Sequence, residues 1–461
     1  MSFSPERLLD ALEIALGDHV GPTAGACIAL SGGLDSTVLL AGLAALAGRR
    51  DRAVAQPLRA IHVDHGLHRD AGRWSEHSVS IARAFGVGCE VVRVDARPGP
   101  GESPEAAARA ARYRAIAQRL QPDELLLTAH HADDQLETVL LQWLRGGGLR
   151  SVAGMRPAVR FASGWHVRPL LGFLRTELRD WAIATGLEWL EDPSNLDTRF
   201  DRNYLRLQLL PILRARWPAA ARTVGRVAAQ AAEALDIELA VAAADLATVA
   251  EGETLVLDGL VRLPAARQRL ALRAWLRSRG FDPPSVATLE SLRRDMLAAG
   301  ADRIPETRWP GAIVRRYRGR LHVTSSNGRP DWRPGRWDVG ADFELGDDGR
   351  LELVAATGVG LSRARLSAGL EVVPRPEGAV FRPAGHAHQR ELRKWLQERG
   401  VLPWRRAALP CVCAGTDIVA IGDLAYGGGL AAAPGEPSWR VVWHDRPTLT
   451  EAEALSGRGA A

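Results

Sequence analysis

The chain has 461 residues, of which 46% are hydrophobic and 25% are charged, and its formal net charge is +5 with a pI near 9.4. This length is enough for about three domains of ~150 residues each. No run approaches the ~18 apolar residues of a membrane span, and the first residues lack the basic and apolar regions of a secretory signal.

The cysteines and the basic residues bear on the compartment and the partners. Cys27, Cys89, Cys411 and Cys413 show no framework of spacings, which is typical of a protein in the reducing cytoplasm. The 59 basic residues include a single lysine, Lys394, and the others are arginines, whose planar guanidinium suits phosphate groups. A GC-rich genome explains the same bias, so the composition permits a nucleic-acid partner without requiring one.

Strands and helices are expected to alternate after a leading helix that ends near Gly17. Apolar runs predict strands, and amphipathic stretches between them predict helices. The strands are 26–30, 58–63, 90–94 and 124–129, and the helices are 72–85, 103–120 and 133–144. Alternation with nearly continuous apolar strands predicts an α/β fold, a doubly wound parallel sheet covered on both faces. Ligands bind such sheets at the carboxyl ends of the strands.

The loop after the first strand carries two adjacent glycines and leads into a helix. Glycine can take φ > 0 and leaves room for a ligand, so backbone N–H groups can converge at the positive end of the helix dipole and bind phosphate. The lysine of a Walker loop is absent. A carboxylate here repels phosphates unless a cation lies between, which predicts Mg²⁺ together with the nucleotide. The loop residues, all expected to bind the nucleotide, are Ser31, Gly32, Gly33, Leu34, Asp35 and Ser36.

This hexapeptide resembles the loop of the ATP pyrophosphatase (PP-loop) family. The resemblance implies cleavage of ATP between its α and β phosphates and adenylation of a substrate oxygen, and it leaves the substrate open. An ordinary strand–helix turn with two glycines is the alternative interpretation.

A second polar cluster follows the fourth strand, in the sequence His130-His131-Ala132-Asp133-Asp134 and on to Glu137. Asp134 and Glu137 are three residues apart on one helix face, and carboxylates are favoured at a helix N-terminus. Asp133 alone would suffice as a cap, so three acids within five residues indicate binding of Mg²⁺ and substrate rather than a transition metal.

Further motifs occur in chain order. Residues 62–67 read His-Val-Asp-His-Gly-Leu, the helix that follows Ser103 carries Arg109, Arg112 and Tyr113 on one side, and 191–206 is a polar segment rich in arginine. We leave His65 out of catalysis, because a loop histidine satisfied by backbone is the commoner case. Together with the two clusters above, these motifs resemble the bacterial tRNA(Ile)-lysidine synthetases over roughly residues 25–215.

The remainder of the chain changes character. Helical spacing predicts a long amphipathic helix from about 224 to 239 and helices at 264–279 and 285–299, and 313–323 is expected to form a hairpin over Gly319. Residues 369–426 resemble the small C-terminal domain of the longer lysidine synthetases. We therefore expect a catalytic domain at 1–215, a mainly helical tRNA-binding domain at 216–330, a linker at 331–366, a small α+β tRNA-binding domain at 367–446 and a disordered tail at 447–461.

The resemblance implies a two-step reaction on the wobble cytidine of the isoleucine tRNA that has a CAU anticodon. The 2-oxo oxygen attacks the α-phosphate of ATP and releases pyrophosphate. The ε-amine of free L-lysine then attacks carbon 2 and expels AMP, which leaves lysidine. The expected cofactors are ATP and Mg²⁺, the expected location is the cytoplasm without a membrane partner, and a homodimer is considered.

Roles for individual residues follow from the same resemblance. Asp35 with Asp133 or Asp134 would carry Mg²⁺, and we favour Asp35 and Asp133. Asp134 and Glu137 are candidates to bind lysine and accept its proton, although the division of roles among the acids stays open. The expected catalytic residues are Asp35, Arg109, Arg112, Asp133, Asp134 and Glu137, where the arginines hold the α-phosphate or the flipped cytosine, and the expected tRNA-binding residues are Arg202, Arg206, Arg382, Arg393 and Lys394.

Three alternatives remain from the residues. A PP-loop tRNA thiolase would need a nucleophilic cysteine or a Cys-x-x-Cys motif beside the sheet. An amidotransferase-type synthetase would need a source of ammonia, and no glutaminase nucleophile is evident. A non-catalytic tRNA-binding protein would give no reason to keep Asp35 together with the acidic cluster.

Overall fold

The computed structural model describes residues 3–16, 25–47, 57–66, 71–99, 103–300, 303–325, 332–366 and 369–456. The chain divides into two compact units, residues 1–237 and 238–461, and the division falls inside helix α10 (Ala220–Val249). Within the described ranges, no helix is both long enough and apolar enough to cross a membrane.

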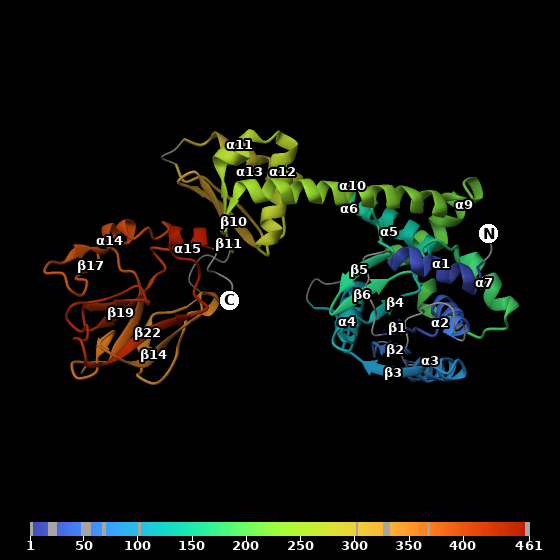
Figure 1. Ribbon diagram of the computed structural model, residues 1–461, viewed down its shortest axis with the longest axis horizontal. Coiled ribbons are helices and arrows are strands. Elements are labelled where there is room, and N and C mark those ends of the chain that lie inside the picture. Colours follow the sequence, from blue (N-terminus) through green and yellow to red (C-terminus); the bar gives the residue numbers. More distant parts are fainter. Residues whose placement is uncertain are drawn as a thin grey trace. The chain divides into compact units, whose positions relative to one another are not determined.

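The first unit is built on a six-stranded sheet with the order β3-β2-β1-β4-β6-β5 (Figure 1). All neighbouring strands are parallel except β5, which pairs antiparallel with β6. The predicted α/β class with a parallel sheet is therefore confirmed. The hairpin β5–β6 is an unpredicted addition. The bounds are β1 Ala26–Ala29, β2 Leu58–Asp64, β3 Gly88–Arg93, β4 Leu125–Leu127, β5 Ala158–Phe161 and β6 Gly164–Val167.

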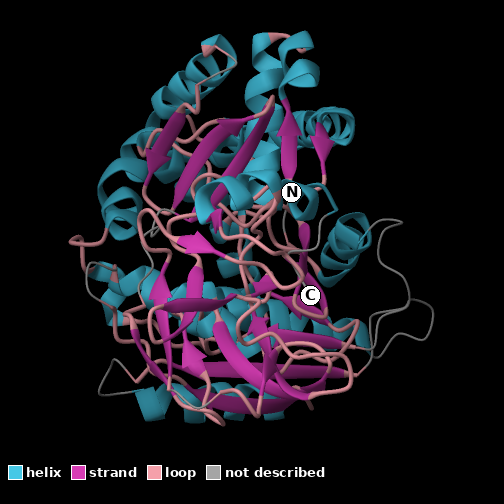
Figure 2. Ribbon diagram, turned by 90° about the vertical axis from the view of Figure 1, so that its left-hand side faces the viewer, coloured by secondary structure: helices cyan, strands magenta, loops and turns pink. Residues whose placement is uncertain are grey.

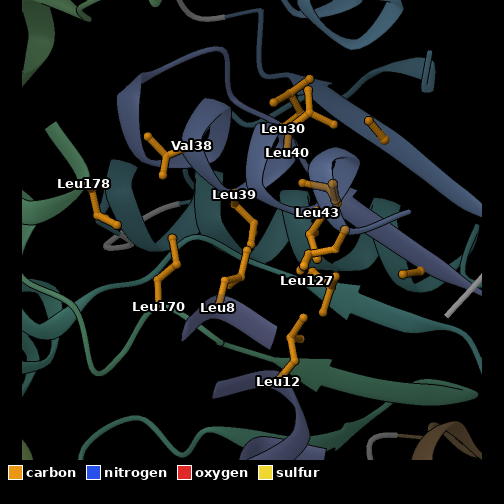
Figure 3. Close-up of a cluster of buried hydrophobic side chains, with 14 of the residues drawn as sticks. Leu8, Leu12, Leu30, Val38, Leu39, Leu40, Leu43, Leu127, Leu170 and Leu178 are labelled. Carbon is orange, nitrogen blue, oxygen red and sulfur yellow. The ribbon is translucent and has the colours of Figure 1, made fainter. Parts of the chain in front are cut away.

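Helices cover both faces of this sheet, because successive strand residues point to opposite sides. Ile28 and Leu127 lie in a core with α1, α2 and α7, which Figure 3 shows, and Cys27 and Leu126 pack with Ile116 of α4 on the other face. The bounds are α1 Pro5–Leu16, α2 Leu34–Ala47, α3 Ala71–Ala84, α4 Pro104–Ala117, α5 Ala132–Leu144, α6 Leu149–Val152, α7 Arg175–Ala184, η2 Pro193–Leu196, α8 Asp201–Tyr204, η3 Leu205–Leu209 and α9 Leu210–Arg216.

The topology fixes where a ligand can bind. Strand β1 lies between β2 and β4, so the chain leaves β1 toward one side of the sheet and later returns to its other side. The loops after β1 and β4 therefore adjoin at the carboxyl edge, at the switch point where ligands bind in such sheets. The two polar clusters singled out in the sequence are these two loops.

The second unit begins with helices packed on an antiparallel sheet of order β7-β8-β11-β10-β9. Trp275 and Leu276 pack there against Val314 and Leu321, so a region expected to be mainly helical also carries a sheet. The predicted hairpin over Gly319 is confirmed, with φ +73° at this glycine. The bounds are β7 Ala250–Glu251, β8 Thr254–Val256, α11 Leu257–Arg262, α12 Ala265–Ser278, α13 Val286–Ala298, β9 Glu306–Trp309, β10 Ala312–Tyr317 and β11 Arg320–Ser325.

The remaining residues of this unit form two further sheets, β12-β16-β19-β20-β21 and β13-β14-β22-β15, and the pair β17–β18 (Figure 2). Strands β12 to β15 occupy the segment expected as a linker, because their apolar residues complete this core with those of β16, β19 and β22. The bounds are β12 Gly335–Trp337, β13 Phe343–Glu344, η4 Gly346–Asp348, β14 Arg350–Thr357, β15 Leu361–Ser362, β16 Leu370–Pro374, β17 Val380–Phe381, β18 Arg390–Glu391, α14 Leu392–Glu398, β19 Pro410–Ala414, β20 Asp417–Ile421, β21 Ala425–Tyr426, β22 Pro437–His444 and α15 Glu451–Ser456.

Part of the segment expected as a disordered tail is ordered. Helix α15 lies in it, and the carbonyl of Ala454 accepts a hydrogen bond of 2.7 Å from the backbone of Glu253. The side chain of Thr448 donates to the Glu253 carboxylate at 2.8 Å. The segment is thus held by residues nearly 200 positions earlier, which a local sequence pattern does not reveal. Residues 457–461 lie outside the described ranges.

Candidate active site at the carboxyl edge of the sheet

The loop between β1 and α2 is held by its own serines. Ser36 accepts a hydrogen bond from the Ser31 backbone at 3.2 Å and donates to the Gly33 carbonyl at 3.1 Å. Gly32 has φ +78°, and a Cβ there would lie 2.8 Å from the Ser78 hydroxyl, so a larger residue does not fit. Helix α2 begins at Leu34, and its first N–H groups have no acceptor within the helix. The loop therefore presents a fixed N-terminus on which an anion can bind.

The loop after β4 ends in a capping box formed by His131 and Asp134. The ring Nδ1 of His131 accepts from the Asp134 backbone at 3.3 Å, and the Asp134 carboxylate accepts from the His131 backbone at 3.1 Å. The N-cap of α5 is thus His131, whereas sequence reasoning weighed Asp133 for that role. When the ring is neutral, Nδ1 accepts and the proton lies on Nε2, which faces Asp35.

Asp35 faces this histidine across the switch point. Its carboxylate lies 3.6 Å from His131 Nε2 and 3.8 Å from Arg175 Nε. Burial opposes ionisation, but the hydrogen bond and charge of His131 and the charge of Arg175 outweigh it and lower the pKa of Asp35. Burial likewise disfavours a charged His131, yet the surrounding carboxylates raise its pKa. Asp35 therefore stays ionised.

Asp133 is already engaged on both carboxylate oxygens. One accepts from the Arg175 backbone at 2.7 Å, and the other accepts from the Arg214 guanidinium at 2.6 Å. The side chain is 8% exposed. As arranged, Asp133 joins α5 to the start of α7 and to the last turn of α9, and its expected role as a metal ligand stays a prediction.

Asp134 and Glu137 are paired with two arginines from α8 and η3. Glu137, 1% exposed, accepts from Arg202 Nε and Arg206 Nε at 2.8 Å each. Asp134 lies 3.3 Å from Arg202 and 3.2 Å from Arg206. Residues 205–209 form a π-helical turn, a feature often found at functional sites. The structure thus brings the expected lysine-binding acids together with two expected tRNA-binding arginines.

The arginines of α4 face other groups. The Arg109 guanidinium lies 4.9 Å from the Tyr113 ring centroid, whereas Arg112 donates to His65 Nε2 at 2.9 and 3.2 Å. The partner of His65 is therefore a guanidinium rather than the expected backbone group. Burial, followed by the Arg112 charge, lowers the pKa of His65 to about 4. Because His65 is neutral, it does not offset the positive charge of Arg112, which can therefore attract a phosphate.

The expected residues of the C-terminal region lie in the second unit. Helix α14 buries Leu392 and Trp395 and leaves Arg393 and Lys394 exposed. Arg382 is exposed at the end of β17. Their proposed contact with tRNA stays a prediction.

A cation would find one suitable oxygen here. Asp35 Oδ1 is buried and accepts no hydrogen bond among the described residues, and its charged neighbour is Arg175 Nε at 3.8 Å. Within the described ranges, no group of three His, Cys, Asp or Glu side chains could enclose a metal ion. Any Mg²⁺ here would therefore draw most of its oxygen ligands from a nucleotide and water, as this ion commonly does.

Sequence reasoning missed the residues that connect the clusters. His131 and Arg175 touch the expected acids, and neither was assigned a role. The available signal was the spacing His131-x-x-Asp134 at the start of a helix, which is that of a capping box. Arg175 gave no comparable signal, because its position follows from the packing of α7.

Comparisons with known proteins match most of this chain. A family model of the PP-loop domain matches residues 12–213, that of the TilS substrate binding domain matches 255–322, and that of the TilS substrate C-terminal domain matches 370–443. The tRNA(Ile)-lysidine synthase of Alkalilimnicola ehrlichii is 44% identical over 94% of this chain and 96% of its own length. The chain belongs to the tRNA(Ile)-lysidine synthase family.

A second curated relative agrees with this membership. The tRNA(Ile)-lysidine synthase of Methylococcus capsulatus is 40% identical over 93% of this chain and 97% of its own length. A solved structure, the U34-tRNA thiolase NcsA from Methanococcus maripaludis with its [4Fe-4S] cluster, is 16% identical with a TM-score of 0.40 over 49% of this chain and 78% of its own. The resemblance noted from the motifs is thereby confirmed for the family.

Replacing Asp133 should destabilise the fold around α5. Asp133→Asn removes the charge that holds Arg214, and we expect the free energy of unfolding to fall by about 1–3 kcal/mol, as for a hydrogen bond to a charged group. The measurement is the urea midpoint of the purified protein. Asp201→Asn, which breaks the exposed pair with Arg145, should cost less than about 1 kcal/mol. Equal losses in the two variants would contradict a structural role for Asp133.

Proposed function

We propose that this chain ligates free L-lysine to carbon 2 of the wobble cytidine in the CAU-anticodon isoleucine tRNA, with ATP converted to AMP and pyrophosphate. The observation that carries the proposal is the convergence of Asp35, the acids of α5 and the arginines 202 and 206 at the switch point of a PP-loop sheet. The matched family models support the same reaction.

The loop after β1 would bind the phosphates in the adenylation half. The free N–H groups at the start of α2 and the nearby Arg175 suit an anion. Asp35 would hold Mg²⁺ through Oδ1, which accepts no hydrogen bond within the described residues and faces Arg175 at 3.8 Å. Asp133, if it joined, would share oxygens that already accept from Arg214 and the Arg175 backbone. A bound Mg²⁺ supplies charge neutralisation for the departing pyrophosphate.

The ligation half requires a neutral amine. The lysine ε-amine has a pKa near ~10.4, so its neutral form costs roughly 4.6 kcal/mol at pH 7. A carboxylate must bind the ammonium and then accept its proton, with desolvation helping. Asp134, 14% exposed, is better placed for this than Glu137, 1% exposed, which would instead fix the arginine pair.

The cysteines disfavour the thiolase alternative. Cys27 is fully buried and burial raises its pKa to about 12, and burial raises the pKa of Cys89 to about 11. A sulfur-transferring cysteine needs a lowered pKa and access, so neither residue suits that role. All four cysteines are free, which supports the proposed cytoplasmic location. A homodimer stays a prediction.

Transfer of lysine is the direct test. The protein incubated with ATP, Mg²⁺, radiolabelled lysine and the CAU isoleucine tRNA should move label into the RNA, measured by acid precipitation. The matched control is methionine tRNA, which has the same anticodon and should remain unlabelled. Absence of label in the isoleucine tRNA, with transfer from another amine or from a sulfur donor, would overturn the proposal.

Substitution of Asp35 should affect the reaction with ATP without affecting the binding of tRNA. Asp35→Ala removes the proposed metal ligand, so pyrophosphate release should be abolished while the dissociation constant for tRNA changes less than about threefold. Phosphate-coupled colorimetry and filter binding measure the two quantities. Asp95→Ala, at an exposed acid paired with Arg97, is the control and should change neither. Parallel loss of both activities would mean that Asp35 is structural.

Arginines of the second unit should contribute to the salt dependence of tRNA binding. Arg382→Ala combined with Arg393→Ala should weaken tRNA binding and reduce the slope of log K against log salt by up to about 1–2. The slope falls because the double variant makes fewer phosphate contacts, and binding then releases fewer counterions. Filter binding between about 50 and 200 mM salt measures the slope. Arg97→Ala serves as the control, and an unchanged slope in the double variant would place the RNA elsewhere.

A further inference from the structure

A row of four polar side chains crosses the carboxyl ends of β4 and β6 beside the proposed site. Arg168 Nη2 lies 3.0 Å from His166 Nδ1, His166 Nε2 lies 2.8 Å from Thr128 Oγ1, and Thr128 Oγ1 lies 2.8 Å from His130 Nδ1. Arg168, His166 and Thr128 are 9%, 2% and 6% exposed. We call these three residues the relay, and the functions assigned above do not use them.

The hydrogen bonds of the relay can run in one direction only. A guanidinium donates and never accepts, so His166 Nδ1 must accept from Arg168. A neutral imidazole carries one proton, which then lies on His166 Nε2 and is donated to Thr128. The Thr128 hydroxyl in turn donates to His130 Nδ1, so the ring proton of His130 lies on Nε2.

The alternative, in which His130 Nδ1 donates to the Thr128 hydroxyl, is unfavourable. If both histidines donated to Oγ1, the hydroxyl proton would need another acceptor, and the described contacts of this side chain offer only the two histidines. Burying an unsatisfied hydroxyl costs about 1–3 kcal/mol. The direction from Arg168 to His130 satisfies the Thr128 hydroxyl and both ring nitrogens of His166.

Both histidines are held neutral. Burial, followed by the charges of Arg168 and Arg109, lowers the pKa of His166 to about 3. Burial and the same two charges lower the pKa of His130 well below its usual value. Because the far end of the relay is a guanidinium, which does not lose its proton, the relay cannot remove a proton from His130. His130 is therefore a fixed donor and not a general base.

The charges around His130 favour an anionic partner. Arg109, Arg168 and Arg202 all act on its ring electrostatically, and no described group accepts a hydrogen bond from Nε2. A neutral donor among three cations is complementary to an oxygen that bears negative charge.

We propose that the relay positions His130 so that Nε2–H donates to a nonbridging oxygen of the α-phosphate, first in ATP and then in the adenylated base. This inference rests on the proposed adenylation. A preorganised donor aimed at a phosphate oxygen lowers the barrier as charge develops there, since it needs no reorientation during the reaction. In these terms Arg168, His166 and Thr128 are positioning residues.

The ring tautomer can be read without any activity. In protein labelled with ¹⁵N-histidine, the two-bond nitrogen–proton spectrum should show His130 with its proton on Nε2, the signal being assigned by its loss in His130→Gln. A proton on Nδ1, or a rapidly exchanging mixture, would overturn the proposal. This result is independent of lysine transfer by the wild-type protein, so failure of the relay and failure of the proposed reaction are distinguishable.

Two substitutions at one position test the kinetic role. Thr128→Val keeps the shape and removes the hydroxyl, whereas Thr128→Ser keeps the hydroxyl. We expect Thr128→Val to lose the Nε2–H tautomer and to lower kcat for pyrophosphate release about tenfold or more, with a smaller change in the KM for ATP, because the lost interaction is strongest in the transition state. Thr128→Ser should restore the tautomer and most of kcat.

Other outcomes contradict the proposal. Equal loss of kcat in the two variants would make Thr128 a packing residue, and a change in KM alone would make His130 a ground-state contact. If Thr128→Val does not fold, the wild-type spectrum still decides the tautomer on which the proposal depends.

Discussion

The first unit depends on neutralising four carboxylates that converge at one edge of its sheet. Each of these carboxylates lies near His131 or near an arginine, and three of them are largely buried. They are Asp35, Asp133, Asp134 and Glu137. Like charges in a low-dielectric setting are strongly unfavourable unless cations pair with them. The segment from Arg175 to Arg214 supplies those cations, so the local charge balance determines how this segment packs.

This arrangement also restricts mechanism. The arginines 202 and 206 hold the acids in the described state and cannot at the same time give their full set of donors to phosphate. If these arginines bind phosphate, as proposed, they must exchange partners within the cluster. Asp35 differs from the other acids because its Oδ1 accepts no hydrogen bond within the described residues and only faces the Arg175 guanidinium at 3.8 Å.

Much of the architecture could be predicted because it rests on local patterns. The apolar strands, the glycine loop at 32 and 33 and the helix starting near 133 each follow from residue type and spacing, and the observed bounds agree within a few residues. The contacts of His131, Arg175 and the relay could not be predicted, since they join residues from separate strands and helices. The order of strands in 331–366 was missed for the same reason, because each strand is defined by a distant partner.

The ion pairs between α5 and residues 202–214 also set the limits of the smallest autonomous fragment. The core that α1, α2 and α7 share with the sheet is complete by residue 189, but a chain ending near residue 190 would lose the packing of Leu136 against Leu210 of α9. Such a fragment would also leave Glu137 and Asp133 desolvated without their guanidinium partners. Apolar contacts and ion pairs therefore both require the independent folding unit to extend through α9.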